Sequence, residues 1–124
     1  MKKQILVIDD DKAIRNSFLL TFEGTECETD TAESGLKGLQ RIKEKSYDLV
    51  FLDLKMPGMD GVQVLKEIKR LNRNLPVYII TAFHKEFFNE LQKVMKDGYE
   101  FEILQKPLNS EQLQSTVEGI LKQL

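Results

Sequence analysis

The pattern of hydrophobic and polar positions alternates between two kinds of segment. Short apolar runs rich in β-branched residues are typical of buried strands, whereas apolar residues three or four apart are typical of amphipathic helices. The runs predict five strands, at residues 5–8, 27–32, 49–53, 76–81 and 99–104. The helical spacing predicts five helices, at residues 12–23, 33–45, 62–71, 84–97 and 110–124. This alternation predicts a doubly wound α/β fold, (βα)5, with a five-stranded parallel sheet and helices on both faces.

The helical spacing also predicts which side of each helix is buried. The expected core positions of the first, second, fourth and fifth helices are Ile14, Phe18, Phe22, Leu36, Leu39, Ile42, Phe87, Leu91, Val94, Met95, Leu113, Val117, Ile120, Leu121 and Leu124. Beside the core stripe of the first helix lies a second stripe, Ala13, Ser17 and Leu20, which is small and mildly apolar and is expected to be partly exposed. Asp60 and Ser110 are predicted to cap the third and fifth helices.

Composition limits the classes of function. The chain has 124 residues, of which 31% are charged, with a formal net charge of -2. A chain of this length forms one core, so we expect a single domain at residues 1–124. No basic surface is indicated, and we expect neither nucleic-acid binding by this chain alone nor membrane association. The first apolar run is too short for a signal peptide, which favours a cytoplasmic protein, and the single cysteine, Cys27, is predicted to be a reduced thiol in a strand.

Polar residues follow four of the apolar runs. Asp9 and Asp10 follow the first predicted strand, Asp53 ends the third, Thr81 ends the fourth and Lys106 follows the fifth. If the strands have the flavodoxin-like order 2-1-3-4-5, the carboxyl ends of these four strands meet at one edge of the sheet. Ligands bind at that edge in open α/β sheets, so the five side chains are predicted to form one site.

The residue types of this site favour phosphoryl chemistry. Three close carboxylates repel one another unless a cation compensates, and oxygen ligands without His or Cys favour Mg²⁺, with Mn²⁺ as a substitute. Mg²⁺ leaves coordination positions for phosphate oxygens, whose charge Lys106 and the Thr81 hydroxyl could share. A carboxylate can serve as the covalent nucleophile, and Asp53 is the best placed because it stands alone at the centre.

The order of these motifs resembles one family closely. The matching residues are Asp9-Asp10, Asp53, the loop Met56-Pro57-Gly58-Met59-Asp60-Gly61, Thr81-Ala82 and Lys106-Pro107. They resemble the receiver domain of two-component response regulators over essentially the whole chain, and we expect a stand-alone single-domain response regulator. The resemblance implies that Asp53 accepts a phosphoryl group from the phosphohistidine of a sensor histidine kinase.

The resemblance also implies roles for the other residues of the site. Asp10 and Asp53 would bind Mg²⁺ directly, Asp9 would act through water, and the backbone carbonyl of Lys55 would complete the protein ligands. Lys106 would contact the phosphate, and Thr81 would move toward it as the activating switch. Asp11, beyond the matched pair, is interpreted as solvated or helix-capping.

The resemblance further implies how partners are contacted. The kinase would dock on the first helix and the loop after the fifth strand, at Ala13, Ile14, Ser17, Leu20 and Pro107. Signalling would proceed by contact with a phosphotransfer protein or a downstream target, from a monomer that could dimerise on phosphorylation. The chain departs from the family at Ile103, where an aromatic residue or His is usual, so the coupling of Thr81 to a rotating ring is not carried over.

Two other classes of function remain open. A degenerate receiver would act only as a protein-binding module, but no acidic or Lys position is missing. A Mg²⁺-dependent phosphohydrolase with an aspartyl nucleophile would need a general acid or base, commonly a carboxylate two residues after the nucleophile, where this chain has Lys55. His84, the single histidine, is interpreted as a loop residue near the rim of the site rather than as a base.

Overall fold

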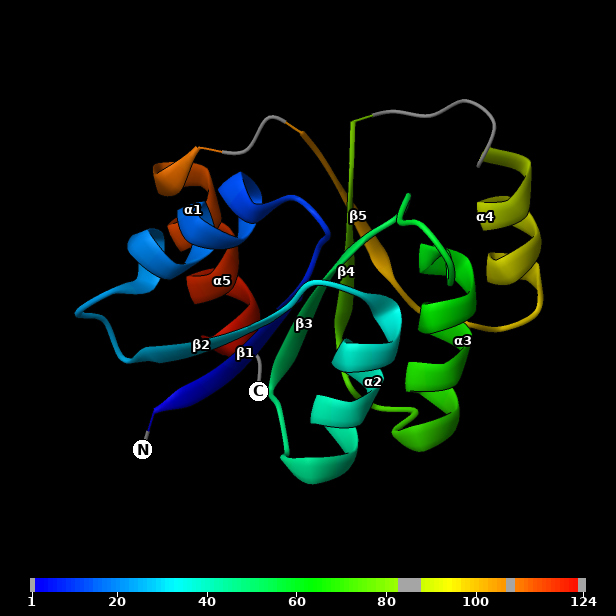
Figure 1. The fold of residues 1–124 in the computed structure, drawn as a ribbon, viewed down its shortest axis with the longest axis horizontal. Helices are drawn as coiled ribbons and strands as arrows, with labels where there is room; N and C mark the ends of the chain where they lie inside the picture. The colour runs from blue at the N-terminus through cyan, green and yellow to red at the C-terminus, as the bar shows by residue number, and fades with distance from the viewer. Residues whose placement is uncertain (1, 83–87, 107–108, 123–124) are drawn as a thin grey trace.

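The computed structural model describes residues 2–82, 88–106 and 109–122. Within these ranges five strands alternate with five helices: β1 (Lys3–Ile8), α1 (Lys12–Phe22), β2 (Cys27–Ala32), α2 (Gly35–Glu44), β3 (Leu49–Asp53), α3 (Gly61–Leu71), β4 (Val77–Thr81), α4 (Phe88–Lys96), β5 (Glu102–Gln105) and α5 (Ser110–Lys122). All strands are parallel, in the order β2-β1-β3-β4-β5 (Figure 1). The predicted fold class and strand order are confirmed.

Helices cover both faces of the sheet and divide the core into two layers. α1 and α5 lie on one face, and α2, α3 and α4 lie on the other (Figure 1). The layer under α1 and α5 contains Ile5, Val7, Phe18, Phe22, Leu49, Phe51, Ile80, Leu113 and Val117. Every residue of the central strand β3 is buried, which is why its sequence is an unbroken apolar run up to Asp53.

Side-chain caps define where most helices begin. The Asp11 carboxylate accepts a hydrogen bond from Ala13 N at 2.9 Å, so Asp11 caps α1. Asp60 caps α3 as predicted, and Gln63 completes a reciprocal capping box with it. The predicted cap of α5 is wrong by one residue, because Asn109 Oδ1 accepts from Gln112 N at 2.8 Å. Ser110 is instead the first residue of the helix.

Two of the predicted core side chains are exposed. Leu36 is 70% exposed because α2 turns Gly35, Gly38 and Leu39 toward the sheet. A Cβ atom at Gly38 would lie 2.4 Å from Ile8 Cδ1, so the helix backbone itself contacts the strand and leaves no room for a larger side chain on that face. Met95 is 58% exposed because the outer helix α4 buries a narrow face, Leu91 and Val94.

The remaining expectations on the elements are mostly confirmed. The fifth strand begins at Glu102, three residues later than predicted, and residues 84–87 of the predicted fourth helix lie outside the described residues, as does Leu124. Cys27 is a free thiol in β2. Among the described residues, no helix is both long and apolar enough to cross a membrane.

The contact between the start of α3 and the end of β3 gives a test of the fold. A Cβ atom at Gly61 would lie 2.6 Å from both the Asp53 carbonyl oxygen and Leu54 Cα, which are backbone atoms. We expect Gly61→Ala to lower the free energy of unfolding by about 2 kcal/mol or more, because the helix must move away from the strand. Urea denaturation measures this change.

The matched control is Gly119→Ala. Gly119 lies inside α5, and a Cβ atom there has no neighbour within 4 Å. This variant should raise the free energy of unfolding by about 0.5–1 kcal/mol, because alanine is less flexible than glycine in the unfolded chain. Equal effects of the two substitutions would contradict the close contact at Gly61.

Candidate functional site

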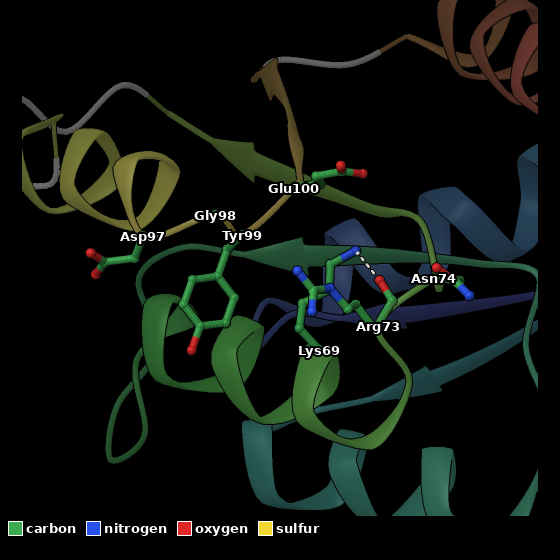
Figure 2. Close-up of a pocket in the computed structure, with 7 residues that line it drawn as sticks. All are labelled: Lys69, Arg73, Asn74, Asp97, Gly98, Tyr99 and Glu100. Carbon is green, nitrogen blue, oxygen red and sulfur yellow. Dashed lines mark hydrogen bonds between the residues drawn. The ribbon is translucent and has the colours of Figure 1, made fainter.

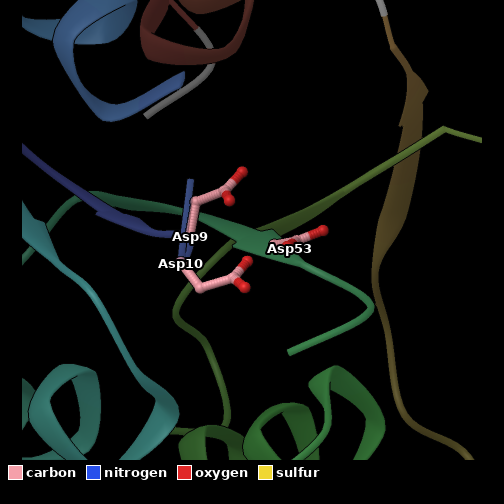
Figure 3. Close-up of side chains that lie close together, drawn as sticks. All are labelled: Asp9, Asp10 and Asp53. Carbon is pink, nitrogen blue, oxygen red and sulfur yellow. The ribbon is translucent and has the colours of Figure 1, made fainter. Parts of the chain in front are cut away.

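Three carboxylates meet at the carboxyl edge of the sheet. Asp9 and Asp10 follow β1, and Asp53 is the last residue of the neighbouring strand β3 (Figure 3). One carboxylate oxygen of each residue lies within 4.8 Å of the others. The predicted convergence of the three acids is therefore present, and these three residues are called the acidic pocket below.

Asp9 is the most deeply buried of the three acids. Its side chain is fully buried, and its Oδ1 accepts a hydrogen bond from Asp11 N at 2.9 Å. Its Oδ2 is also buried and faces the Lys106 side chain. Its backbone carbonyl accepts a hydrogen bond from Arg15 Nη1 at 2.8 Å, so α1 holds the end of β1 in place.

Lys106 supplies the positive charge that faces these acids. Its Nζ lies 3.2 Å from Asp9 Oδ2 and 3.5 Å from Asp53 Oδ1. Its backbone is fixed by a hydrogen bond of 2.6 Å from Lys106 N to the Thr81 carbonyl, at the end of β4. Burial lowers the pKa of the ammonium, but the charges of Asp53 and Asp9 outweigh this effect and raise it, so the group stays protonated.

Asp53 is held in an environment that disfavours its charged form. Burial first, and then the charge of Asp9, raise the pKa of the Asp53 carboxyl to about 7. A hydrogen bond shared with Asp10 also raises this pKa, whereas Lys106 and a hydrogen bond from the Lys55 backbone lower it. The single ammonium of Lys106 therefore does not balance the carboxylates of the site.

The acidic pocket fits a divalent cation. It presents oxygen ligands only, contains two buried carboxylates, and sets three acids against the one ammonium of Lys106. These are the properties of a site for a hard ion such as Mg²⁺. The loop that carries Lys55 is fixed beside it, because Leu54 and Met56 on either side are buried and Leu54 N donates to the Ile80 carbonyl at 3.3 Å.

Thr81 lies at the same edge of the sheet, and Ile103 lies farther back along the neighbouring strand β5. Thr81 is buried at the end of β4 and pairs in register with Gln105 of β5. Ile103 pairs with Ile79, and its side chain is 48% exposed. An exposed aliphatic side chain therefore stands on β5 at the position where the resemblance would place a ring.

The predicted docking residues of α1 are on the surface. Ala13 and Ser17 are exposed, Leu20 is 70% exposed, and Ile14 is partly buried against α5 and the sheet. The start of α5 adjoins the end of this helix, because the Ser110 hydroxyl lies 3.1 Å from Thr21 Oγ1. Pro107 and His84 lie outside the described residues.

A separate cavity of about 140 Å³ lies at the opposite end of the sheet from the acidic pocket. It is lined by Lys69, Arg73, Asn74, Asp97, Gly98, Tyr99 and Glu100 (Figure 2). The buried Lys69 ammonium donates hydrogen bonds to the carbonyls of Leu75, at 2.7 Å, and Arg73, at 3.5 Å. Two cations and two acids balance in this lining, and Lys69 has a structural role there, since it fixes the turn between α3 and β4.

Comparison with known proteins identifies the family. Residues 5–118 match the sequence profile of the response regulator receiver domain. The chain belongs to this family. The receiver domain is similar to the transcriptional regulatory protein ZraR of Salmonella typhimurium, with 38% identity over 120 residues, which cover 97% of this chain and 26% of ZraR. It thus spans about a quarter of the length of that relative.

Two further comparisons agree with the fold and the family. The sporulation initiation phosphotransferase F of Bacillus subtilis is 39% identical over 83 residues, which cover 67% of each protein. The crystal structure of a CheY-like response regulator receiver domain protein from Methanospirillum hungatei JF-1 superimposes with a TM-score of 0.85 at 26% identity, over 99% of this receiver domain and 96% of that chain.

Sequence reasoning did not find Arg15. Its hydrogen bond to the Asp9 carbonyl fixes the backbone of the receiver domain beside the acidic pocket, but the first helix was interpreted only by its apolar stripes. Its position in the sequence could have indicated this role. Arg15 lies four residues after Asp11, the cap of α1, and faces the end of β1, which precedes that cap. A long cation at that position can reach back to the last carbonyl groups of β1.

The raised pKa of Asp53 predicts how the stability of the metal-free protein depends on pH. The folded carboxyl has a pKa of about 7, against about 3.9 in an unfolded chain, so the folded state binds more protons between these values. The contribution of this group to stability is present below about pH 4 and is lost as the pH rises through about 7. Asp53→Asn removes the titrating carboxyl, so the variant does not lose this stability as the pH rises.

We therefore expect metal-free Asp53→Asn to be more stable than the wild type at pH 8 by about 1–3 kcal/mol, and to lose most of this advantage at pH 4. Urea denaturation at the two pH values measures the difference between the proteins. The exposed residue Asp97 supplies the control, and Asp97→Asn should change stability by less than about 0.5 kcal/mol at both. A constant difference between wild type and Asp53→Asn would contradict the electrostatic origin.

Proposed function

We propose that this receiver domain accepts a phosphoryl group from the phosphohistidine of a sensor histidine kinase onto Asp53, in a Mg²⁺-dependent reaction. The observation that carries the proposal is the position of Asp53. It lies at the end of the central strand, within 4.8 Å of two other acids and 3.5 Å from the Lys106 ammonium. Asp9 shares these contacts, but its side chain is fully buried, whereas the side chain of Asp53 is 9% exposed.

Asp9, Asp10 and Asp53, with the Lys55 carbonyl, would hold the Mg²⁺ ion, and Mn²⁺ has the same ligand preference. The bound ion would neutralise charge on the oxygens of the transferred group. Lys106 would act beside it, because its ammonium is already held by Asp9 at 3.2 Å, next to the oxygen of Asp53 that would be modified. Thr81, on the adjacent strand end, would respond to the new phosphoryl group.

In the proposed reaction an oxygen of ionised Asp53 attacks the phosphorus atom of the phosphohistidine. The new bond joins this carboxylate oxygen to phosphorus, and the bond between phosphorus and the imidazole nitrogen breaks. The imidazole keeps the electron pair of the broken bond and is then protonated by solvent. Burial of Asp53 supports this role, since a desolvated carboxylate is a stronger nucleophile than a hydrated one.

The phosphorylated form would act through protein contacts. The printed names of two relatives, a transcriptional regulatory protein and a phosphotransferase, indicate two settings in which receivers work. For this chain we propose transfer to or contact with a second protein, either a phosphotransfer protein or a downstream target. The acidic pocket and Lys106 together disfavour a degenerate binding module, and the exposed Lys55 side chain supplies no general acid for a phosphohydrolase.

Intact-protein mass spectrometry tests phosphoryl acceptance. After incubation with Mg²⁺ and acetyl phosphate, we expect the wild type to gain the mass of one phosphoryl group, and Asp53→Asn to gain none. Lys106→Ala should be labelled at least about tenfold more slowly, because the developing charge loses its cation. Asp97→Asn serves as the control and should be labelled like the wild type.

Omission of Mg²⁺ should abolish the labelling of the wild type. An adduct on Asp53→Asn, or labelling that is independent of metal, would overturn the proposed site. Wild-type protein that binds Mg²⁺ but forms no adduct with acetyl phosphate or with a phosphorylated histidine kinase would establish the binding module instead.

Substitutions on α1 test the proposed docking surface. Ser17→Glu and Leu20→Glu should each slow phosphoryl transfer from a kinase that labels the wild type, by about fivefold or more. Leu20 is exposed and apolar, so the proposed contact with the kinase is apolar here, and either substitution would place a negative charge in it. Labelling by acetyl phosphate should be unchanged. Gln92→Glu on the exposed side of α4 adds the same charge elsewhere and should leave both rates unchanged.

Kinetics of transfer from the phosphorylated kinase measure the effect. Unchanged kinase rates in both α1 variants would exclude this surface. Equal slowing with acetyl phosphate would mean that the substitutions disturb the acidic pocket rather than docking.

A further inference from the structure

A basic cavity lies beside the acidic pocket at the same edge of the sheet. It has a volume of about 280 Å³ and is lined by Arg15, Thr31, Ala32, Glu33, Lys37 and Arg41. Thr31 and Ala32 end β2, and Asp9 N donates a hydrogen bond of 3.1 Å to the Ala32 carbonyl. The cavity therefore continues the ligand-binding edge of the sheet on the side away from Lys106.

The lining of this cavity has an excess of positive charge. Three cationic side chains face one carboxylate, that of Glu33, which forms an ion pair with Lys37 and is also stabilised by the charge of Arg15. α2 begins at Gly35, and the positive end of its dipole adds to the potential next to the cavity, with Lys37 N of its first turn capped by Ser34. The local charge is thus opposite to that of the acidic pocket.

Arg15 is preorganised to bind an anion. Its Nη1 is fixed by the hydrogen bond of 2.8 Å to the Asp9 carbonyl, which leaves the guanidinium with further N–H groups beyond the one in use. A guanidinium held in this way loses little side-chain entropy when it binds an oxyanion with its remaining donors. Arg41, one turn after Lys37 on α2, supplies a second guanidinium to the same cavity.

We propose that this basic cavity is a second anion site, which binds the phosphate group of a small phosphate ester or free inorganic phosphate. A tetrahedral dianion has enough oxygens to accept from both guanidinium groups, the Lys37 ammonium and the Thr31 hydroxyl, whereas a carboxylate has only two oxygens. The volume is roughly nine times the ~30 Å³ that a water molecule occupies in the liquid, which leaves room for a small organic group on the phosphate.

Metal-free protein in buffer of constant ionic strength provides the cleanest test, because the acidic pocket without a cation repels anions. Inorganic phosphate and glycerol 2-phosphate are titrated separately, and the backbone amide resonances of residues 31–37 are followed by NMR. We expect saturable shifts with both probes. A higher affinity for the ester would identify a phosphate ester as the ligand, and equal affinities would identify the free phosphate group.

Arg41→Gln is the decisive variant, because Arg41 lines the cavity but does not hold the Asp9 carbonyl. It should weaken binding by about tenfold, the factor expected for one charge-assisted hydrogen bond. Lys43→Gln is the matched control: it removes one positive charge from the same helix outside the cavity, and affinity should change by less than about twofold. Thermal unfolding of both variants checks that they are folded.

Three outcomes would overturn the proposal. Shifts that grow linearly without saturation would indicate nonspecific association. Equal weakening in Arg41→Gln and Lys43→Gln would show that net charge, not the cavity, attracts the anion. Shifts centred on residues 9, 10 and 53 would place the anion in the acidic pocket. None of these outcomes bears on whether Asp53 is phosphorylated.

Discussion

The acidic pocket depends on electrostatic repulsion that the fold does not fully compensate. Asp9 and Asp53 are both buried, and one ammonium, that of Lys106, lies between them at 3.2 and 3.5 Å. Burial, together with this imbalance, raises the pKa of Asp53 to about 7. A fully balanced site would be more stable but would have no affinity for a cation and no reason to accept a new anionic group.

The sheet makes this imbalance tolerable by fixing the backbone on every side. β1 and β3 are neighbours and are buried where they pair, so Asp9 and Asp53 cannot move apart without breaking the register between Ile8 and Leu52. Arg15 holds the Asp9 carbonyl from α1, and the close contact of Gly61 with Leu54 holds the loop after Asp53. The stability of the two core layers thus compensates for the unfavourable electrostatics at their edge.

The sequence predicted the fold and the acidic pocket for the same reason. Buried parallel strands must be continuous apolar runs, so the polar residue that ends each run marks the carboxyl edge of the sheet. Leu36 and Met95 were misplaced because apolar spacing does not show how closely a helix approaches the sheet. At α2 the approach is set by Gly38 against Ile8, and glycine carries no hydrophobic signal.

The parts of the site that sequence could not predict come from side chains with long reach. The position of Lys106 in the chain predicted a cation at the edge, but not that its ammonium would lie between Asp9 and Asp53 rather than against one of them. Arg15 was not identified because its partner is a backbone carbonyl, which no residue pattern reveals. Charge patterns predict that groups meet; they do not predict which atoms share the proton or the cation.

The arrangement around Lys106 explains how a change at Asp53 would reach the surface. A phosphoryl group on Asp53 would replace a singly charged oxygen with a dianion, and the Lys106 ammonium would then be drawn from Asp9 toward it. Lys106 is joined through its backbone to Thr81 at the end of β4, and β5, which immediately precedes it, carries the exposed Ile103. Because β5 is an edge strand and is largely exposed, a small movement there costs little packing energy. The same charge imbalance that would recruit a cation therefore acts, through Lys106, on an exposed edge strand that lies beyond β4 from the residue that would be modified.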